Sequence, residues 1–270
     1  MARKEEALQM RIGASINSAH THDFNGTIDD VAVYENALND SDVLQLFNNQ
    51  SVRFASFGDQ IFRPFNTSFN TNSINVTETF QNLFNSNISA RIGQINSSVN
   101  ISQLLAYYPT DFGKGWDATT NGHDVIQEIG NPQFNKTSGV NGTGGTEYDG
   151  SDGLELGPNE KAFNFVRTNN FSMSAWVLVN SDTNTQRTFL SKLEASPGFQ
   201  GYEWRLHNND RWRFFMIGTS SGNIINVQSS PAFDYGNYHH YVVTYNGSSA
   251  ASGVEMYVDG LRIDTTTITD

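Results

Sequence analysis

Three oxygen-bearing side chains, Asp117, Asn121 and Asp124, lie close together on a loop that glycines flank. A hard cation such as Ca²⁺ needs a cluster of oxygen ligands, which carboxylates and amides supply. Asp29 and Asp30 could complete the set, so these five residues are a candidate calcium site. In the alternative, Asp117 and Asn121 form Asx-turns and Asp30 bonds backbone amides at a sheet edge. We prefer this structural alternative and keep Ca²⁺ as the candidate cofactor.

The histidines give little support for a transition-metal site. His239 and His240 are neighbours on an expected strand, so they point to opposite faces and cannot share an ion. His20 and His22 could share one face, although a solvated loop is the expected setting. The sequence also contains no P-loop, dinucleotide fingerprint or nucleophile elbow. These patterns predict no catalytic residue.

Acceptor triplets for N-linked glycans are frequent, and they are concentrated between Asn49 and Asn100. Chance in a chain rich in Asn, Ser and Thr is the alternative explanation. The glycosylation candidates are Asn66, Asn75, Asn87, Asn96 and Asn100. A glycan-coated segment would place the protein outside the cell.

The composition favours an all-β protein. The 270 residues are 37% hydrophobic and 12% aromatic but only 16% charged, and Asn, Ser, Thr and Gly fill the difference. A net charge of −12 without a basic cluster argues against nucleic acid as a partner. No apolar run approaches the ~20 residues of a transmembrane helix. The absence of cysteine removes disulfide and thiolate chemistry, and the first ten residues lack the apolar core of a secretory signal.

Clear period-two alternation predicts a series of strands in the second half of the chain, joined by short polar turns. Such a series is typical of a sandwich. The expected strands cover 171–179, 188–193, 202–206, 212–216, 224–227, 238–245 and 254–258. Tyr202, Trp204 and Trp212 could form a sugar-stacking platform, but the alternation predicts that they lie in the core.

The N-terminal segment has a comparable pattern. A short strand is expected to end at Gly13, Asn25-Gly26 is a turn signal, a strand covers 28–34, and a short helix covers 42–48. The apolar residues that would carry the pairing of these two strands are Leu8, Met10, Ile12, Ile28, Val31 and Val33.

The pattern F-x-G-x-I-D-D-V-x-V-Y-x-x-A-L at 24–38, followed by a small helix, resembles the C-terminal edge of laminin-G-like (concanavalin-like) jelly rolls. F-S-x-S-A-W-V from Phe171, Y-H-H-Y-V-V-T-Y from Tyr238 and V-x-M-Y-V-D-G from Val254 resemble the central strands of that family. The resemblance implies an antiparallel laminin-G-like jelly-roll sandwich, in a protein with a partly helical or extended connector. It also implies that the loop at 117–124 lies near a Ca²⁺ site.

The elements of the family appear in a rotated order. Residues 1–49 carry its last strands and closing helix, 50–103 form an Asn/Ser/Thr-rich connector or stalk, and 104–270 form a sandwich that lacks those last strands. An open sandwich would leave apolar faces and backbone groups uncovered. The N-terminal strands could fold back onto the same chain, or they could complete another copy head to tail. In a third alternative, the sequence is one repeat of a longer array of such domains, divided at a point inside a sandwich. The second and third alternatives are preferred.

Glu147, Asp149 and Asp152 resemble the acidic triad E-x-D-x-x-E of concanavalin-like glycosidases, whose carboxylates act as nucleophile and general acid. Here Gly150 and Gly153 interrupt the strand, so a turn is expected and the chain is not predicted to be an enzyme.

The leading hypothesis is therefore a non-enzymatic extracellular structural protein, a filament or fibre subunit whose partners are further copies of itself. A carbohydrate-binding or adhesion module of a phage tail fibre or cell-surface protein is the alternative, with glycans as partners. A glycoside hydrolase is the weakest hypothesis. The expected location is extracellular, on a cell surface or on a virion exterior, without membrane insertion.

Overall fold

The computed structural model describes residues 9–15, 22–51, 103–110, 113, 115–157, 161–180, 185–194, 200–218 and 223–270. The strands are β1 (Arg11–Ile12), β2 (Phe24–Tyr34), β3 (Leu104–Tyr108), β4 (Val125–Ile129), β5 (Gln133–Asn135), β6 (Gly145–Leu156), β7 (Asn170–Leu178), β8 (Arg187–Leu193), β9 (Gly201–His207), β10 (Arg211–Ile217), β11 (Ile224–Ser229), β12 (His239–Asn246), β13 (Val254–Val258), β14 (Leu261–Ile263) and β15 (Thr265–Thr269). The helices are α1 (Asp40–Ser51) and the 3₁₀ turns η2 (Val140–Gly142), η3 (Lys161–Phe163) and η4 (Ala251–Gly253).

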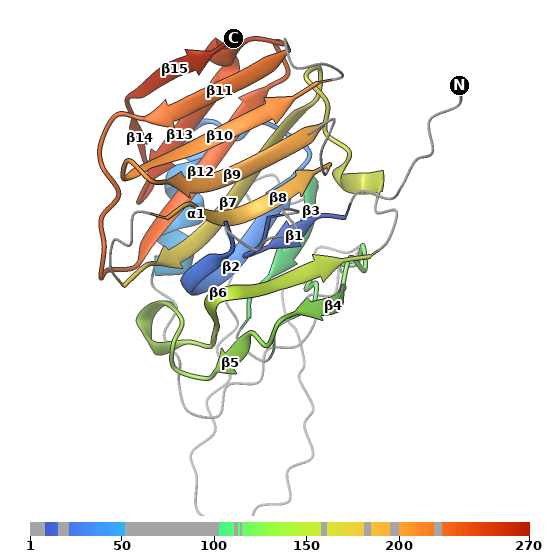
Figure 1. Cartoon of the computed structure of the whole chain (residues 1–270), viewed down its shortest axis with the longest axis vertical. Coiled ribbons are helices and arrows are strands. Elements are labelled where there is room, and N and C mark those ends of the chain that lie inside the picture. Colours follow the sequence, from blue (N-terminus) through green and yellow to red (C-terminus); the bar gives the residue numbers. More distant parts are fainter. Residues whose placement is uncertain are drawn as a thin grey trace, which may run out of the picture.

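The strands form two antiparallel layers that face each other (Figure 1). The layer called sheet A here has the order β4-β6-β1-β8-β9-β10-β11-β15, and sheet B has the order β14-β13-β12-β7-β2-β6. Strand β6 belongs to both layers, because it pairs with β2 and β5 up to Asp152 and with β1 and β4 from Gly153 onward. The structure confirms the predicted all-β antiparallel sandwich.

The N-terminal strands occupy places inside the sandwich of their own chain. Strand β1 lies between β6 and β8 in sheet A. Strand β2 pairs with β7 on one side and with β6 and then β3 on the other. Of the residues predicted to carry this pairing, all but Leu8 are buried in the main core, and Leu8 lies outside the described residues. Within one chain the strands therefore pair as in the fold-back alternative, and the preferred exchange of strands between copies stays a prediction.

Tethering explains this difference from the preferred alternatives. A strand joined covalently to its own sandwich is present at a high effective concentration there. It therefore covers the apolar faces and the backbone ladder groups without the entropic cost of associating two molecules. Residues 52–102, which include all five glycosylation candidates and nearly all of the predicted connector, lie outside the described residues.

Strand β2 is longer than predicted and contains two irregularities. The expected turn at Asn25-Gly26 is instead a bulge within the strand, where the register against β6 shifts between Phe24 and Asn25. Gly26 has a φ of +145°, and a Cβ there would meet the Leu178 carbonyl oxygen at 2.2 Å. The second bulge lies at Asp29 and Asp30, where the partner of β2 changes from β6 to β3.

Aromatic side chains fill the space between the two layers. Trp204 and Trp212 lie 5.7 Å apart between ring centroids, and Tyr241 packs edge-on against Trp212 at 5.1 Å. Phe171 and Tyr202 join the same core, and all five side chains are buried. Because side chains alternate along β9 and β10, every second residue of these strands lies in the core and the others lie on the outer face of sheet A.

The outer face of sheet B is covered by α1. Asn39 Oδ1 accepts from the Asp42 N–H at 3.0 Å, and Asp42 Oδ2 accepts from the Asn39 N–H at 3.1 Å, so a reciprocal capping box starts the helix. Val43, Leu46 and the partly buried Phe47 face the sheet, where Phe47 stacks on Trp176 at 5.6 Å. The described residues place no helix of comparable length over the outer face of sheet A.

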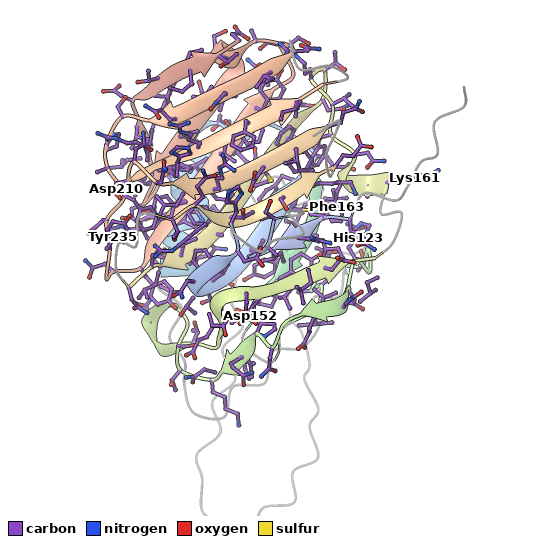
Figure 2. All side chains as sticks on the ribbon, viewed as in Figure 1. His123, Asp152, Lys161, Phe163, Asp210 and Tyr235 are labelled. Carbon is purple, nitrogen blue, oxygen red and sulfur yellow. The ribbon has the colours of Figure 1, made fainter. Side chains whose placement is uncertain are left out.

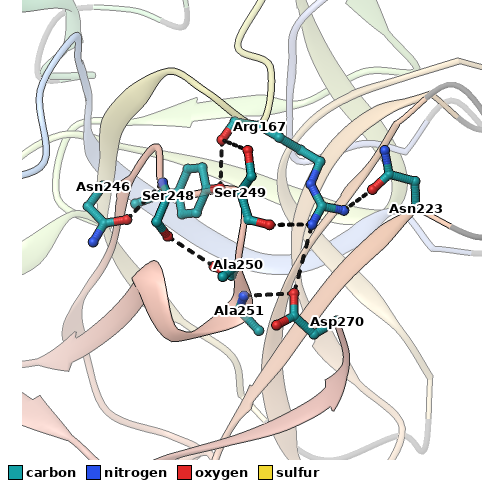
Figure 3. A network of polar contacts seen from close by, with 9 residues as sticks. Arg167, Asn223, Asn246, Ser248, Ser249, Ala250, Ala251 and Asp270 are labelled. Carbon is teal, nitrogen blue, oxygen red and sulfur yellow. Dashed lines mark hydrogen bonds and ion pairs between the residues drawn. The ribbon is translucent and has the colours of Figure 1, made fainter.

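One arginine ties together loops at one end of the sandwich (Figure 3). The Arg167 guanidinium donates to Asn223 and to the Ser249 carbonyl oxygen, and it lies 3.8 Å from the Asp270 carboxylate. The Arg167 carbonyl oxygen accepts from Tyr245 Oη at 2.7 Å. These bonds fix the turn between β12 and β13 against the loop that precedes β7.

None of the described helices has both the length and the apolar character required to cross a membrane.

Candidate functional site

Asp117, the first of the predicted calcium ligands, is fully buried and bonded by protein donors. Its Oδ1 accepts from the N–H groups of Tyr107 and Thr119, both at 3.0 Å. Its Oδ2 accepts from Thr119 Oγ1 at 2.8 Å and from the His123 N–H at 2.9 Å. The donors direct hydrogen atoms at both oxygens, so a cation would have to displace them. These contacts support the Asx-turn alternative.

Asp124 and Asn121, two further calcium-ligand candidates, form hydrogen bonds that stabilise the same loop. Asp124 Oδ1 accepts from the Asp117 N–H at 2.8 Å. Asn121 Nδ2 donates to the carbonyl oxygens of Leu104 and Leu105, at 3.2 and 2.8 Å. The loop is thereby fastened to the edge of β3.

Asp29 and Asp30 lie at the second bulge of β2 and are fully buried. Asp29 accepts from Thr110 Oγ1 at 2.8 Å and from Thr143 Oγ1 and the Val140 N–H, both at 3.0 Å. Asp30 Oδ1 accepts from Tyr107 Oη at 2.5 Å. Tyr107 thus contacts Asp30 through its hydroxyl and Asp117 through its backbone N–H, which connects the two halves of the predicted site through one residue.

The described residues contain no group of three or more His, Asp or Glu side chains arranged to hold a metal ion. The hydrogen bonds around Asp117 and Asp29 explain their burial without a cation, because each carboxylate already has several donors. The five-residue calcium site stays a prediction.

The acidic triplet lies within the continuous strand β6, so the expected turn is wrong. Gly150 is accommodated in a bulge, because Asp149 and Asp152 pair with the consecutive residues Asn25 and Phe24 of β2. Asp152 accepts from the N–H groups of Asn131 and Asp149, at 2.7 and 3.0 Å. Asp149 Oδ1 accepts from the Ser151 N–H and hydroxyl, at 2.9 and 2.7 Å. These bonds lower the pKa of Asp149, with the Ser151 hydroxyl as the largest cause. Glu147 accepts from Asn135 Nδ2 at 3.0 Å on the surface. Each member of the triplet therefore has a local structural partner.

The two neighbouring histidines of β12 have different surroundings. His239 lies between two carboxylates, with Nδ1 2.6 Å from Asp259 and Nε2 2.9 Å from Asp234. The hydrogen bond with Asp259 is the main reason that its pKa is raised. His240 is buried under α1 between Phe47 and Trp176, and burial lowers its pKa to about 3. Neither ring nitrogen of His240 has a hydrogen-bond partner within the described residues.

The outer face of sheet A carries polar side chains, and no helix in the described part of the chain covers it. Two rows cross it, and each row is defined by direct register between neighbouring strands. The first row is Arg11, Ser191, Glu203, Phe215 and Asn226. The second row is Thr188, Arg205, Arg213, Gln228 and Thr266. Figure 2 shows side chains projecting from these strands toward the viewer.

One part of this face is covered by the chain itself. The Thr188 N–H donates to the His22 carbonyl oxygen at 2.8 Å, and Ser191 Oγ donates to the Ala14 carbonyl oxygen at 2.7 Å. The N-terminal segment therefore passes over β8. The outer faces of β9, β10 and β11 beyond it are partly exposed.

Four basic residues form a compact group on the partly exposed part. Arg205 and His207 of β9 lie directly opposite Arg213 and Arg211 of β10. We call these four residues the basic block. Arg205 Nη1 donates to Glu203 at 3.2 Å, and its guanidinium lies 4.4 Å from the centroid of the Phe215 ring.

The mutual electrostatics of the block are unfavourable. Burial, followed by the charges of Arg213 and Arg205, lowers the pKa of His207 to about 4. Burial is also the main reason that the pKa values of Arg205 and Arg213 are lowered, and Arg213 contributes to the shift of Arg205. The Nε atoms of both arginines are buried without a hydrogen-bond partner in the described part of the chain.

The sequence analysis missed this block because it found no basic run in the linear sequence. The available signal was the alternation of β9 and β10 combined with the tight turn at 208–210. Together they place every second residue of both strands on the outer face. Tyr202, Trp204 and Trp212 lie on the opposite, buried face, so the predicted core position is confirmed and the sugar-stacking platform is not formed.

Two packed antiparallel layers with shared edge strands are the architecture of a jelly-roll sandwich. Residues 148–270 match the family model Laminin_G_3, described as the concanavalin A-like lectin/glucanases superfamily. The chain thus contains a laminin-G-like jelly-roll domain, and the match runs from β6 through β15. Neither a curated protein nor a solved structure was found to match the chain. Domains of this fold often bind glycans and are typical of extracellular proteins.

Proposed function

We propose that the chain is a non-enzymatic, extracellular carbohydrate-binding or adhesion module that holds its saccharide on the outer face of sheet A. The observation that carries the proposal is the contrast between the two outer faces. Helix α1 covers that of sheet B with an apolar cluster, whereas β9 to β11 present arginine, asparagine and glutamine side chains. Such donors and acceptors suit sugar hydroxyls.

Asn226 supports this assignment. It lies on β11 opposite Phe215, and its Oδ1 is buried without a hydrogen-bond partner in the described residues. Gln228, two residues along the same face, accepts a long 3.4 Å bond from Asn209, and its side chain has no other hydrogen bond to the residues that the structure describes. Both amides can therefore bond a ligand without breaking a strong internal contact.

The test is a glycan array followed by calorimetry of the strongest ligands. We expect Asn226→Ala to weaken the binding by about tenfold, because one hydrogen bond to a bound sugar is lost. Asn170→Ala is the matched control, since Asn170 is exposed on β7 of sheet B. Equal losses in both variants, or an array without any binding, would contradict the proposal.

The non-enzymatic part of the proposal is supported by the contacts of the acidic triplet. Glycoside hydrolysis by two carboxylates needs them free to reach the bond, and Asp149 and Asp152 are bonded within the bulge of β6. Ligands identified on the array should be recovered intact after long incubation. New reducing ends that disappear in Asp152→Asn would establish the hydrolase hypothesis instead.

A fibre subunit is the second candidate. The segment with β1, β2 and α1 is joined to β3 only through residues 52–102. The same contacts could therefore form between copies, as in domain swapping. Sedimentation and electron microscopy separate the candidates: a monomer at all concentrations excludes the fibre, and filaments support it.

A further inference from the structure

The arrangement of the basic block favours the binding of an anion. Like charges directly opposite on neighbouring strands destabilise a sheet, and here Arg205 faces Arg213 while His207 faces Arg211. The chain as a whole carries a net charge of −12, so gathering cations on one patch runs against its composition. A structural need for packing would be met equally well by neutral side chains.

Protein carboxylates compensate only part of this charge. Glu203 contacts Arg205 and also accepts from Thr188 Oγ1 at 2.5 Å, so its oxygens are engaged. Arg211 and Arg213 form no ion pair and no side-chain hydrogen bond within the described residues. Asp210, in the adjoining turn, accepts from Tyr235 Oη at 2.7 Å. Two guanidinium groups therefore lack an acidic partner in the described part of the chain.

We propose that the basic block binds the carboxylate of an acidic saccharide, such as a uronate. This inference rests on the proposed carbohydrate-binding function and names the class of ligand. The planar fork of an arginine matches a carboxylate with two parallel hydrogen bonds, and among the described residues the Arg213 side chain has no hydrogen-bond or ion-pair partner that a ligand must displace.

The surroundings of the block fit the rest of such a sugar. Gln228 lies directly beside Arg213 on β11, and Asn226 follows on the same face. Strands in a sheet are about 4.8 Å apart, so the row from Arg205 to Gln228 spans about 10 Å, which is comparable with a disaccharide. The amides can bond hydroxyls while the guanidinium groups hold the acid.

The charge distribution also favours a short ligand over a long polyanion. The block is confined to two strands, whereas the chain elsewhere is acidic and would repel an extended chain of negative charges. One carboxylate placed at the block gains the attraction without that penalty.

Protonation of His207 should be linked to binding. The charged and titratable groups near this ring are Arg205, Arg211, Arg213, His22 and Glu203. A bound carboxylate offsets the repulsion from the arginines and so raises the pKa of His207 from about 4. The affinity should therefore increase as the pH falls from 8 to 5, but only by about twofold for one added charge interaction, because a ring with a free pKa of about 4 is still mostly neutral at pH 5.

The experiment is calorimetry of the whole chain with three short saccharides. They are a digalacturonate, its methyl ester, and a sulfated disaccharide that carries no carboxylate. We expect the free acid to bind at least about tenfold more tightly than the ester, as one charge-assisted pair would give. Its affinity should fall with added salt. Arg213→Gln should remove this preference, whereas Arg262→Gln makes the same charge change on β14 of sheet B and should leave it intact.

Each outcome separates this inference from the proposed function. Equal binding of acid and ester overturns the acidic assignment but leaves a carbohydrate-binding module. Tighter binding of the sulfated analogue overturns the carboxylate in favour of sulfate. An unchanged preference in Arg213→Gln, with the melting temperature of the wild type, removes the basic block as the site. A lack of binding to any saccharide overturns both proposals.

Discussion

At the scale of single residues, buried polar groups are informative because each one must be matched by its surroundings. Asp117 is fully buried and accepts four hydrogen bonds from its own loop and from β3. His240 is equally buried, but no hydrogen bond reaches its ring within the described residues. The first residue stabilises the fold through its charge, and the second is tolerated only while it is neutral.

We expect Asp117→Ala to lower the free energy of unfolding by about 2–4 kcal/mol, because the change leaves several buried N–H groups without an acceptor. Denaturant titration measures this change. A chelator should leave the midpoint of the wild type unchanged if the carboxylate is purely structural. A calcium-dependent rise in stability that Asp117→Ala abolishes would instead support the predicted calcium site.

The stability of the protein should decrease in acid through His240. Its pKa is depressed to about 3 because burial disfavours the charged ring. Between about pH 6.5 and pH 3 the unfolded chain takes up a proton that the folded chain does not bind, so the free energy of unfolding falls by up to about 1.4 kcal/mol per pH unit. His240→Phe, placed between Phe47 and Trp176, should flatten this dependence in denaturation curves at pH 8 and pH 5.

His239 should contribute to the pH dependence of stability with the opposite sign. His239 has a raised pKa because of Asp259, so its stabilisation is present at low pH and is lost as the pH rises through the folded pKa. His239→Gln should therefore lose more stability at pH 5 than at pH 8. Parallel pH profiles for the wild type and both variants would contradict these assignments.

At the scale of elements, α1 is the piece that distinguishes the two outer faces of the sandwich. It covers Ala32, Val242 and Tyr257 of sheet B with Val43 and Leu46. Its own start is fixed by the capping box of Asn39 and Asp42. Because isolated helices of this length are marginal, both the cap and the sheet contact are needed for the helix to form.

Asn39→Ala should lower the free energy of unfolding by about 1 kcal/mol, the typical cost of a lost N-cap. Asn48→Ala on the same helix is the control, since Asn48 is exposed and lies in the C-terminal half of α1, away from the capping box. The control should unfold like the wild type or slightly later, because alanine favours helix. Thermal melts of both variants test the cap, and a neutral Asn39→Ala would show that packing alone fixes the helix start.

At the scale of the whole molecule, two segments that are distant in sequence make one sandwich. Strand β2 has neighbours on both sides, namely β7 on one and β6 and β3 on the other. Strand β1 bridges β6 and β8. Much of the backbone ladder at the centre of the fold therefore depends on residues 9–51.

A protease site inserted within residues 52–102 tests this dependence. After cleavage, the N-terminal fragment should stay bound to the remainder under native conditions, since its strands are paired within the same molecule. Native mass spectrometry measures the association, and denaturant should release both fragments in one transition. Spontaneous separation of the fragments, or binding of a labelled N-terminal fragment to the remainder of another molecule, would favour strand sharing between copies.

Local pattern predicted most of the individual elements. The alternation in β9 and β10 was recognisable because one face of each strand lies in the core, and this binary pattern is a property of neighbouring residues. The turn signal at Asn25-Gly26 was misleading because the same residue types also suit a bulge within a strand. The resemblance at 24–38 predicted β2 as one of the last strands of a sandwich but could not say which copy it pairs with.

The sequence by itself determined an antiparallel sandwich with a capped closing helix, because periodicity, turn chemistry and capping act over a few residues. Only the tertiary structure decided that β1 and β2 complete their own chain, since a missing strand can be supplied by any identical copy and the choice depends on tethering in three dimensions. The tertiary structure also created the basic block, because the pairing of β9 with β10 brings four residues together that alternate with core positions along the chain.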